Sequence, residues 1–92
     1  MTTLRRRVTV AVHNGVHARP VAELVRLAEA HGADVRLSTS AGDTVDLSSV
    51  LAVMDLAIAS GEEVTLEVAD APEAAALLDA LSEVLAPAQP AP

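Results

Sequence analysis

The feature that most constrains the fold is the change of hydrophobic period along the chain, from two residues to three or four and back. Val8, Val10 and Val12 alternate with more polar residues, which predicts a half-buried strand. Residues 18–31 then repeat apolar side chains at helical spacing, and Gly32 is a natural stop. Because such strands and helices each bury one face, the chain must pack helices against a sheet.

The pattern continues along the rest of the chain. It predicts a hairpin over residues 35–47, a helix over Val50–Ile58 and a strand over residues 64–68. Asp70 or Ala71 would cap the last helix, with Pro72 near its first position. The order β-α-β-β-α-β-α predicts an α+β two-layer sandwich, with three helices covering one face of a four-stranded antiparallel sheet.

Length and composition set further limits. The 92 residues suffice for one domain, expected over residues 1–86, with a disordered Pro/Ala-rich tail over residues 87–92. The net charge of −7 and the absence of aromatic residues argue against nucleic-acid binding. No cysteine is present, and no apolar stretch is long enough to span a bilayer. We therefore expect a cytoplasmic monomer that needs no metal and no cofactor.

His17 stands just before Arg19 and Pro20, at the predicted start of the first helix. A helix start presents unpaired N–H groups and a positive dipole end, which favour an anion and disfavour a protonated imidazole. A neutral imidazole is a nucleophile towards phosphorus, and the Arg19 guanidinium matches phosphate oxygens. These residues suit the acceptance of a phosphoryl group. The alternative is an ordinary polar histidine beside a solvated arginine.

Two features surround the second predicted helix. Ser48 and Ser49 precede it, and either hydroxyl could cap the helix or accept a regulatory phosphate. The helix itself is too apolar for a single buried face, which would leave Val50, Leu51 and Met54 partly exposed. An exposed apolar patch near a reactive group suggests partner docking. The alternative is a helix that is simply well buried.

Two segments resemble the signatures of one family. Residues 14–20, NGVHARP, resemble the active-site signature of HPr, the histidine-containing phosphocarrier of the bacterial sugar phosphotransferase system. Residues 49–57, SVLAVMDLA, resemble the second HPr signature, around its regulatory serine. The resemblance runs from about Arg6 to Leu85, and it implies the HPr fold, an open-faced β-sandwich.

The resemblance implies a stoichiometric phosphocarrier, not an enzyme. His17 would be phosphorylated through Nδ1, and Arg19 would contact the phosphate. Enzyme I, charged by phosphoenolpyruvate, would be the donor, and IIA proteins would be the acceptors. Ser49 would correspond to the site that an HPr kinase phosphorylates in some bacteria. Three apolar residues would form part of the surface that docks enzyme I and the IIA proteins: Val50, Leu51 and Met54.

The chain departs from the family pattern in places. Val21 stands where a small residue usually follows the Arg-Pro pair, and Ser48 stands where a basic residue often precedes the regulatory serine. Basic residues near the docking face are few, chiefly Arg19 and Arg26, so we expect slower association with acidic partners. One alternative function is an HPr-like regulatory module that acts by docking, in a nitrogen-type or other regulatory branch. Another is an unrelated ferredoxin-like domain that binds a metal or a small ligand.

Overall fold

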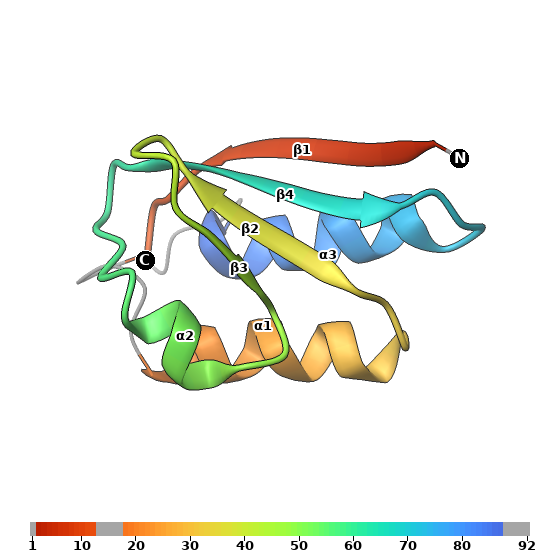
Figure 1. Cartoon of the computed structure of the whole chain (residues 1–92), viewed down its shortest axis with the longest axis horizontal. Coiled ribbons are helices and arrows are strands. Elements are labelled where there is room, and N and C mark those ends of the chain that lie inside the picture. Colours follow the sequence, from red (N-terminus) through yellow and green to blue (C-terminus); the bar gives the residue numbers. More distant parts are fainter. Residues whose placement is uncertain (1, 13–17, 88–92) are drawn as a thin grey trace.

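The computed structural model describes residues 2–12 and 18–87, and its elements follow the predicted order β-α-β-β-α-β-α (Figure 1). Most of the tail predicted over residues 87–92 lies outside the described residues. The elements are β1 (Thr3–Thr9), α1 (Ala18–Ala30), β2 (Val35–Thr39), β3 (Thr44–Asp46), α2 (Val50–Met54), β4 (Glu63–Ala69) and α3 (Ala74–Leu85).

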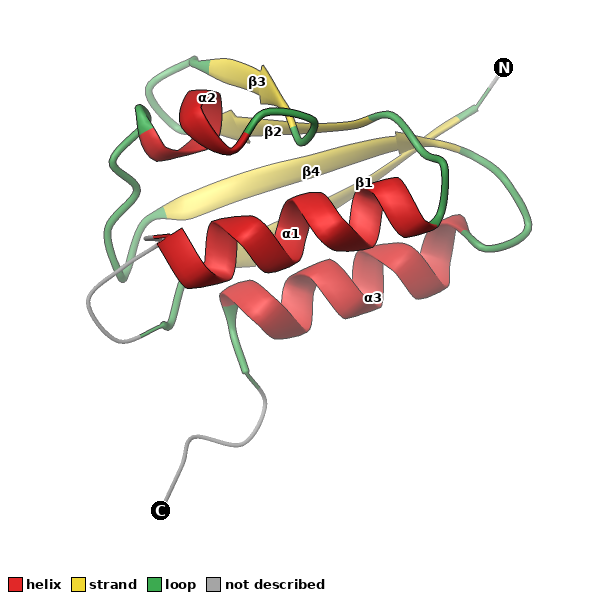
Figure 2. Cartoon of the chain, turned by 90° about the horizontal axis from the view of Figure 1, so that it is seen from below, coloured by secondary structure: helices red, strands yellow, loops and turns green. Residues whose placement is uncertain are grey.

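The strands form one four-stranded sheet in the order β1-β4-β2-β3, and each neighbouring pair is antiparallel. Helices α1 and α3 lie side by side across one face of this sheet, and α2 lies on the same side (Figure 2). The opposite face is open (Figure 1). The predicted α+β open-faced sandwich is therefore confirmed.

The core lies between the sheet and the helices. Val8 on β1, Leu37 on β2 and Leu66 on β4 point towards the helices and are buried. Burial of an aliphatic side chain of this size stabilises a fold by about 1.5–3 kcal/mol. The buried stripe of α1, which fixes the rotation of that helix about its axis, consists of Val21, Leu24, Val25 and Ala28.

A row of alternating charge crosses the open face of the sheet. Arg5 lies opposite Glu67, which lies opposite Arg36, which in turn lies opposite Asp46. Arg5 pairs with Glu67, and the Arg36 Nε and Asp46 Oδ1 atoms are 3.7 Å apart. Opposite charges on neighbouring strands attract, so this row stabilises the pairing of all four strands.

The first strand differs from the prediction at both ends. The alternating valines predict a strand from Val8 onward, whereas β1 begins at Thr3 and ends at Thr9. The three arginines do not interrupt it, because carboxylates on neighbouring elements pair with them. Val10 lies beyond the strand but is still buried, and its N–H donates to the Glu62 carbonyl at 2.8 Å.

The second helix ends earlier than predicted, at Met54 and not at Ile58. Ala57 adopts a φ of +50°, and its N–H donates to the Met54 carbonyl at 3.0 Å. This left-handed residue turns the chain away from the helix axis. Ile58 thereby reaches the core, where it is 3% exposed.

The last helix begins later than predicted, at Ala74, with Glu73 in the cap position. Asp70 is four residues before the helix and is not its cap; its N–H donates to the Thr2 carbonyl at 2.8 Å and extends the pairing of β1 with β4. The predicted buried face of the helix is confirmed, and it consists of Ala74, Leu77, Leu78, Leu81 and Leu85.

Candidate functional site

The candidate phosphoryl acceptor, His17, lies outside the described residues, as does His13. The structure describes the chain on both sides of residues 13–17. On one side, the Ala11 N–H donates to the Leu85 carbonyl at the end of α3, at 2.9 Å. On the other side, α1 begins at Ala18. The site can therefore be assessed from the first turn of α1 and from the surface beside it.

The first turn of α1 packs one side against the core and exposes the other side to solvent. Val21, the bulky departure from the family pattern, is fully buried. Its extra volume therefore fills the core under the turn and adds nothing to the exposed surface. Arg19 is exposed, and Pro20 follows it near the helix start, where the missing N–H removes no helical hydrogen bond.

Arg19 differs from the other arginines in its pairing. In the part of the chain that the structure describes, it is the one arginine with no carboxylate at ion-pair distance. Its guanidinium is therefore free to meet an anion from outside. The other arginines pair as follows: Arg5 with Glu67, Arg6 with Asp79 at 2.6 Å, Arg7 with Glu63 at 3.6 Å, Arg26 with Glu23, and Arg36 with Asp46 at 3.7 Å.

Arg26, the second basic residue expected near the docking face, forms an ion pair with Glu23. Its Nε donates to Glu23 Oε2 at 3.0 Å, and its Nη2 donates to Glu23 Oε1. These hydrogen bonds lower the pKa of the Glu23 carboxyl, and the charge of Arg26 adds to the effect. Sequence reasoning missed this pair, although the i, i+3 spacing of acid and base on one helix was the available signal.

The start of α2 distinguishes between the two serines. Ser49 is the N-cap, and its Oγ accepts the Ala52 N–H at 3.2 Å. Ser48 is exposed and does not cap the helix. Ser49 is also exposed, so capping and access to a kinase are compatible.

The exposed apolar patch predicted on α2 is present. The side chains of Leu51 and Met54 are exposed, by 74% and 39%, and Val50 is half-buried. Val53 on the opposite side of the helix is 1% exposed and holds α2 against the core. The alternative of a fully buried helix is therefore wrong for Leu51 and Met54. Helix α2, which carries this patch, lies beside the N-terminal half of α1 (Figure 2).

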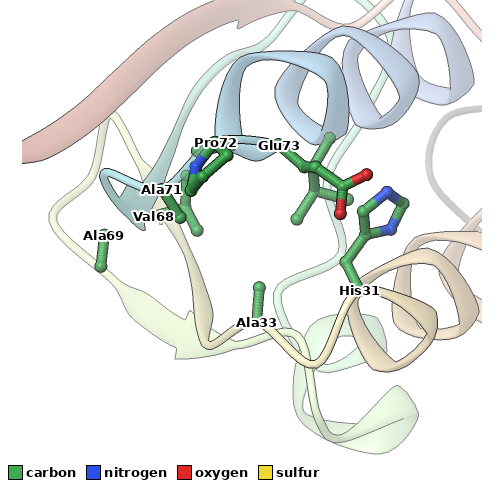
Figure 3. A pocket seen from close by; sticks show the side chains of 9 residues that line it. His31, Ala33, Val68, Ala69, Ala71, Pro72 and Glu73 are labelled. Carbon is green, nitrogen blue, oxygen red and sulfur yellow. The ribbon is translucent and has the colours of Figure 1, made fainter.

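His31, the one histidine among the described residues, follows the C-terminal end of α1. It lines a pocket of about 180 Å³, together with Glu73 and with apolar side chains that are mostly small (Figure 3). Helix α1 has 13 residues, so this pocket is about 20 Å from the first turn. Because a carbonyl only accepts, the His31 Nδ1 atom, 3.0 Å from the Leu27 carbonyl, carries the proton. Because it lies at the other end of α1, the pocket is separate from the candidate site.

The described residues contain neither a candidate metal site nor a helix suited to a membrane. No three histidine, cysteine or carboxylate side chains within residues 2–12 and 18–87 gather into a group that could hold a metal ion. None of the helices described has the length and hydropathy needed to cross a membrane.

Comparisons with known proteins agree with the fold and with the two sequence signatures. The family model described as the PTS HPr component phosphorylation site matches residues 4–86. The phosphocarrier protein HPr of Streptomyces coelicolor is 41% identical over 81 residues, which cover 88% of this chain and 86% of that protein. HPr of Haloferax volcanii is 41% identical over 83 residues, covering 89% and 92%. The crystal structure of HPr from Bacillus anthracis superposes with a TM-score of 0.82 at 32% identity, covering 92% and 99%.

Proposed function

The chain belongs to the HPr family of phosphocarrier proteins of the phosphotransferase system, and on that premise we propose that His17 is its phosphoryl acceptor. Enzyme I, charged by phosphoenolpyruvate, supplies the phosphoryl group. IIA proteins of a sugar phosphotransferase system receive it. The chain acts as a cytoplasmic monomer, and it is a stoichiometric carrier that needs no cofactor.

The transfer step is a substitution at phosphorus. The lone pair of a neutral His17 Nδ1 forms a bond to phosphorus while the bond from phosphorus to the donor breaks. On the next transfer the N–P bond breaks in turn, and the imidazole is regenerated. The imidazole is free again after the second transfer, so the role of the chain is that of a carrier.

The single observation that carries this proposal is the unpaired state of Arg19. The chain holds more than twice as many carboxylates as arginines, yet no described carboxylate pairs with this guanidinium. Arg19 lies two residues after His17, and a guanidinium offers N–H donors in the geometry of phosphate oxygens. A free arginine at this position can neutralise the phosphoryl group as it arrives.

The patch on α2 supports a docking role. Val50, Leu51 and Met54 provide the apolar contact for enzyme I and for the IIA proteins, beside the helix that carries Arg19. Methionine adapts to differently shaped partners. Ser49 is proposed as the site of an HPr kinase. A phosphate there would lie at the edge of this patch, and it would weaken docking without unfolding α2.

The test is phosphorylation of the purified protein by enzyme I and phosphoenolpyruvate, followed by intact mass. We expect the wild type to gain one phosphoryl group that is labile to acid, and His17→Ala to gain none. His31→Ala is the matched control, because His31 is an exposed histidine at the other end of α1, and it should react like the wild type. Arg19→Ala should slow transfer by roughly 10- to 1000-fold, the cost of one lost charge-stabilising contact.

Two outcomes would overturn the proposal. Phosphorylation of His17→Ala would move the acceptor to another residue. No phosphorylation of the wild type would favour the regulatory alternative, in which the chain acts only by docking.

A further inference from the structure

Glu23 lies within reach of two arginines on the same helix. It follows Arg19 by four residues and precedes Arg26 by three, and both spacings bring side chains together on a helix surface. The structure assigns its carboxylate to Arg26 through two hydrogen bonds, one to each carboxylate oxygen. Arg19 is left without a partner among the described residues.

We propose that Arg26 is a positioning residue, which holds the Glu23 carboxylate away from Arg19 and so keeps Arg19 free for the phosphoryl group. This inference rests on the proposed function of His17 and Arg19. It assigns to Arg26 a role that needs no contact with a partner protein.

Two physical reasons favour Arg26 over Arg19 as the partner of Glu23. The fork of Arg26 binds both carboxylate oxygens at once, which is a stronger and more directional arrangement than a single contact. In addition, an acid that precedes its base along a helix is better oriented than an acid that follows its base. The lowered pKa of the Glu23 carboxyl agrees with this assignment.

Loss of Arg26 would release a carboxylate one turn from Arg19. The released Glu23 can then form the i, i+4 pair with Arg19 and compete with the phosphoryl oxygens for the same guanidinium. Exposed helical pairs of this kind shift an equilibrium by about twofold. We therefore expect phosphoryl transfer to slow by about two- to threefold, far less than on loss of Arg19 itself.

The first test is a double-mutant cycle on the single-turnover rate of phosphorylation by enzyme I. We expect Arg26→Gln to be about two- to threefold slower than the wild type, in line with the strength of such pairs. Glu23→Gln should react at the wild-type rate. The double variant, Glu23→Gln with Arg26→Gln, should recover that rate, because no carboxylate is left to occupy Arg19. If Arg26 instead contacts the partner directly, the double variant will stay as slow as Arg26→Gln, and the inference is overturned.

The second test needs no phosphoryl transfer. The pKa of the Glu23 carboxyl can be followed by NMR titration of the unphosphorylated protein. In Arg26→Gln it should stay below its ordinary value, because Arg19 takes over the pairing. In the variant that also carries Arg19→Gln, it should rise to the ordinary value. A return to the ordinary value in Arg26→Gln alone would show that Glu23 does not turn to Arg19.

These measurements separate the inference from the function on which it rests. If the wild type is not phosphorylated, the proposed function fails, and with it the benefit of a free Arg19, while the titration still decides which arginine Glu23 takes. If the wild type is phosphorylated and the cycle shows no rescue, only the role of Arg26 fails. Circular dichroism of each variant checks that α1 is intact.

Discussion

At the scale of single residues, Ala57 has a backbone conformation that costs free energy. Its φ of +50° lies in the left-handed region, where a residue with a Cβ is disfavoured by roughly 1–2 kcal/mol. Its side chain is exposed, so the methyl group contributes little packing in return. The conformation is kept because the chain must leave α2 and bury Ile58.

Ala57→Gly should therefore stabilise the protein. Relief of the left-handed strain exceeds the extra entropy of an unfolded glycine, and we expect a gain of about 0.5–1 kcal/mol in the free energy of unfolding. Chemical denaturation measures this difference. Ala59→Gly is the control, since Ala59 is also exposed but has no positive φ, and it should be destabilising. Equal losses in both variants would show that Ala57 is unstrained.

At the scale of elements, α2 depends on its cap. It has only five residues, and the Ser49 hydroxyl satisfies one of the N–H groups that a helix start leaves unpaired. Ser49→Ala should lower the free energy of unfolding by about 1 kcal/mol. Ser49→Asp keeps an acceptor and places a negative charge at the helix start, so its stability should stay near that of the wild type.

The same two variants separate stability from docking. The carboxylate of Ser49→Asp lies at the edge of the apolar patch. We therefore expect enzyme I to have a higher KM for this variant than for the wild type, while the unfolding curve stays unchanged. Ser48→Ala is the control for both measurements, since Ser48 does not cap α2. If Ser49→Asp unfolds as easily as Ser49→Ala, the hydroxyl does not stabilise α2 by accepting a hydrogen bond.

The types of the elements could be predicted from the sequence, but several of their ends could not. Hydrophobic patterns, turn signals and cap signals are local properties, and together they predicted the strands and helices that the structure describes. The start of β1 depends on partners far along the chain, because Arg5 pairs with Glu67, which lies opposite it on β4, and Arg7 pairs with Glu63, two residues along β4 from its opposite residue. The end of α2 depends on where Ile58 must be buried, which is a property of the whole core.

Some features of the candidate site could likewise be predicted from the sequence, and others could not. The motif around His17 predicted Arg19 as a phosphate contact, and the apolar excess of α2 predicted the exposure of Leu51 and Met54. The free state of Arg19 could not be predicted, because it requires knowing where every other carboxylate lies. The choice between Ser48 and Ser49 as the cap required the backbone geometry at the helix start.

At the scale of the whole molecule, the described core closes near the end of α3. Leu85 is fully buried, and its carbonyl accepts the Ala11 N–H at 2.9 Å, which ties the two ends of the domain together. Deletion of residues 87–92 should therefore leave the melting temperature and the phosphorylation rate unchanged. Deletion of residues 85–92 removes this buried leucine and should cost about 2–5 kcal/mol of stability, as other losses of a core leucine do. A fall in melting temperature with the shorter deletion would extend the domain beyond residue 86.

The described helices all lie on one side of the sheet, and this arrangement affects how two phosphoryl transfers can follow each other. Helix α2 lies beside the N-terminal half of α1 (Figure 2), so under the proposed function a donor and an acceptor would compete for the same side of the molecule. In that case each carrier molecule would have to release one partner before it binds the next. The overall rate of phosphoryl transfer would then be limited by the dissociation of each partner. A substitution that tightened both complexes would lower this rate.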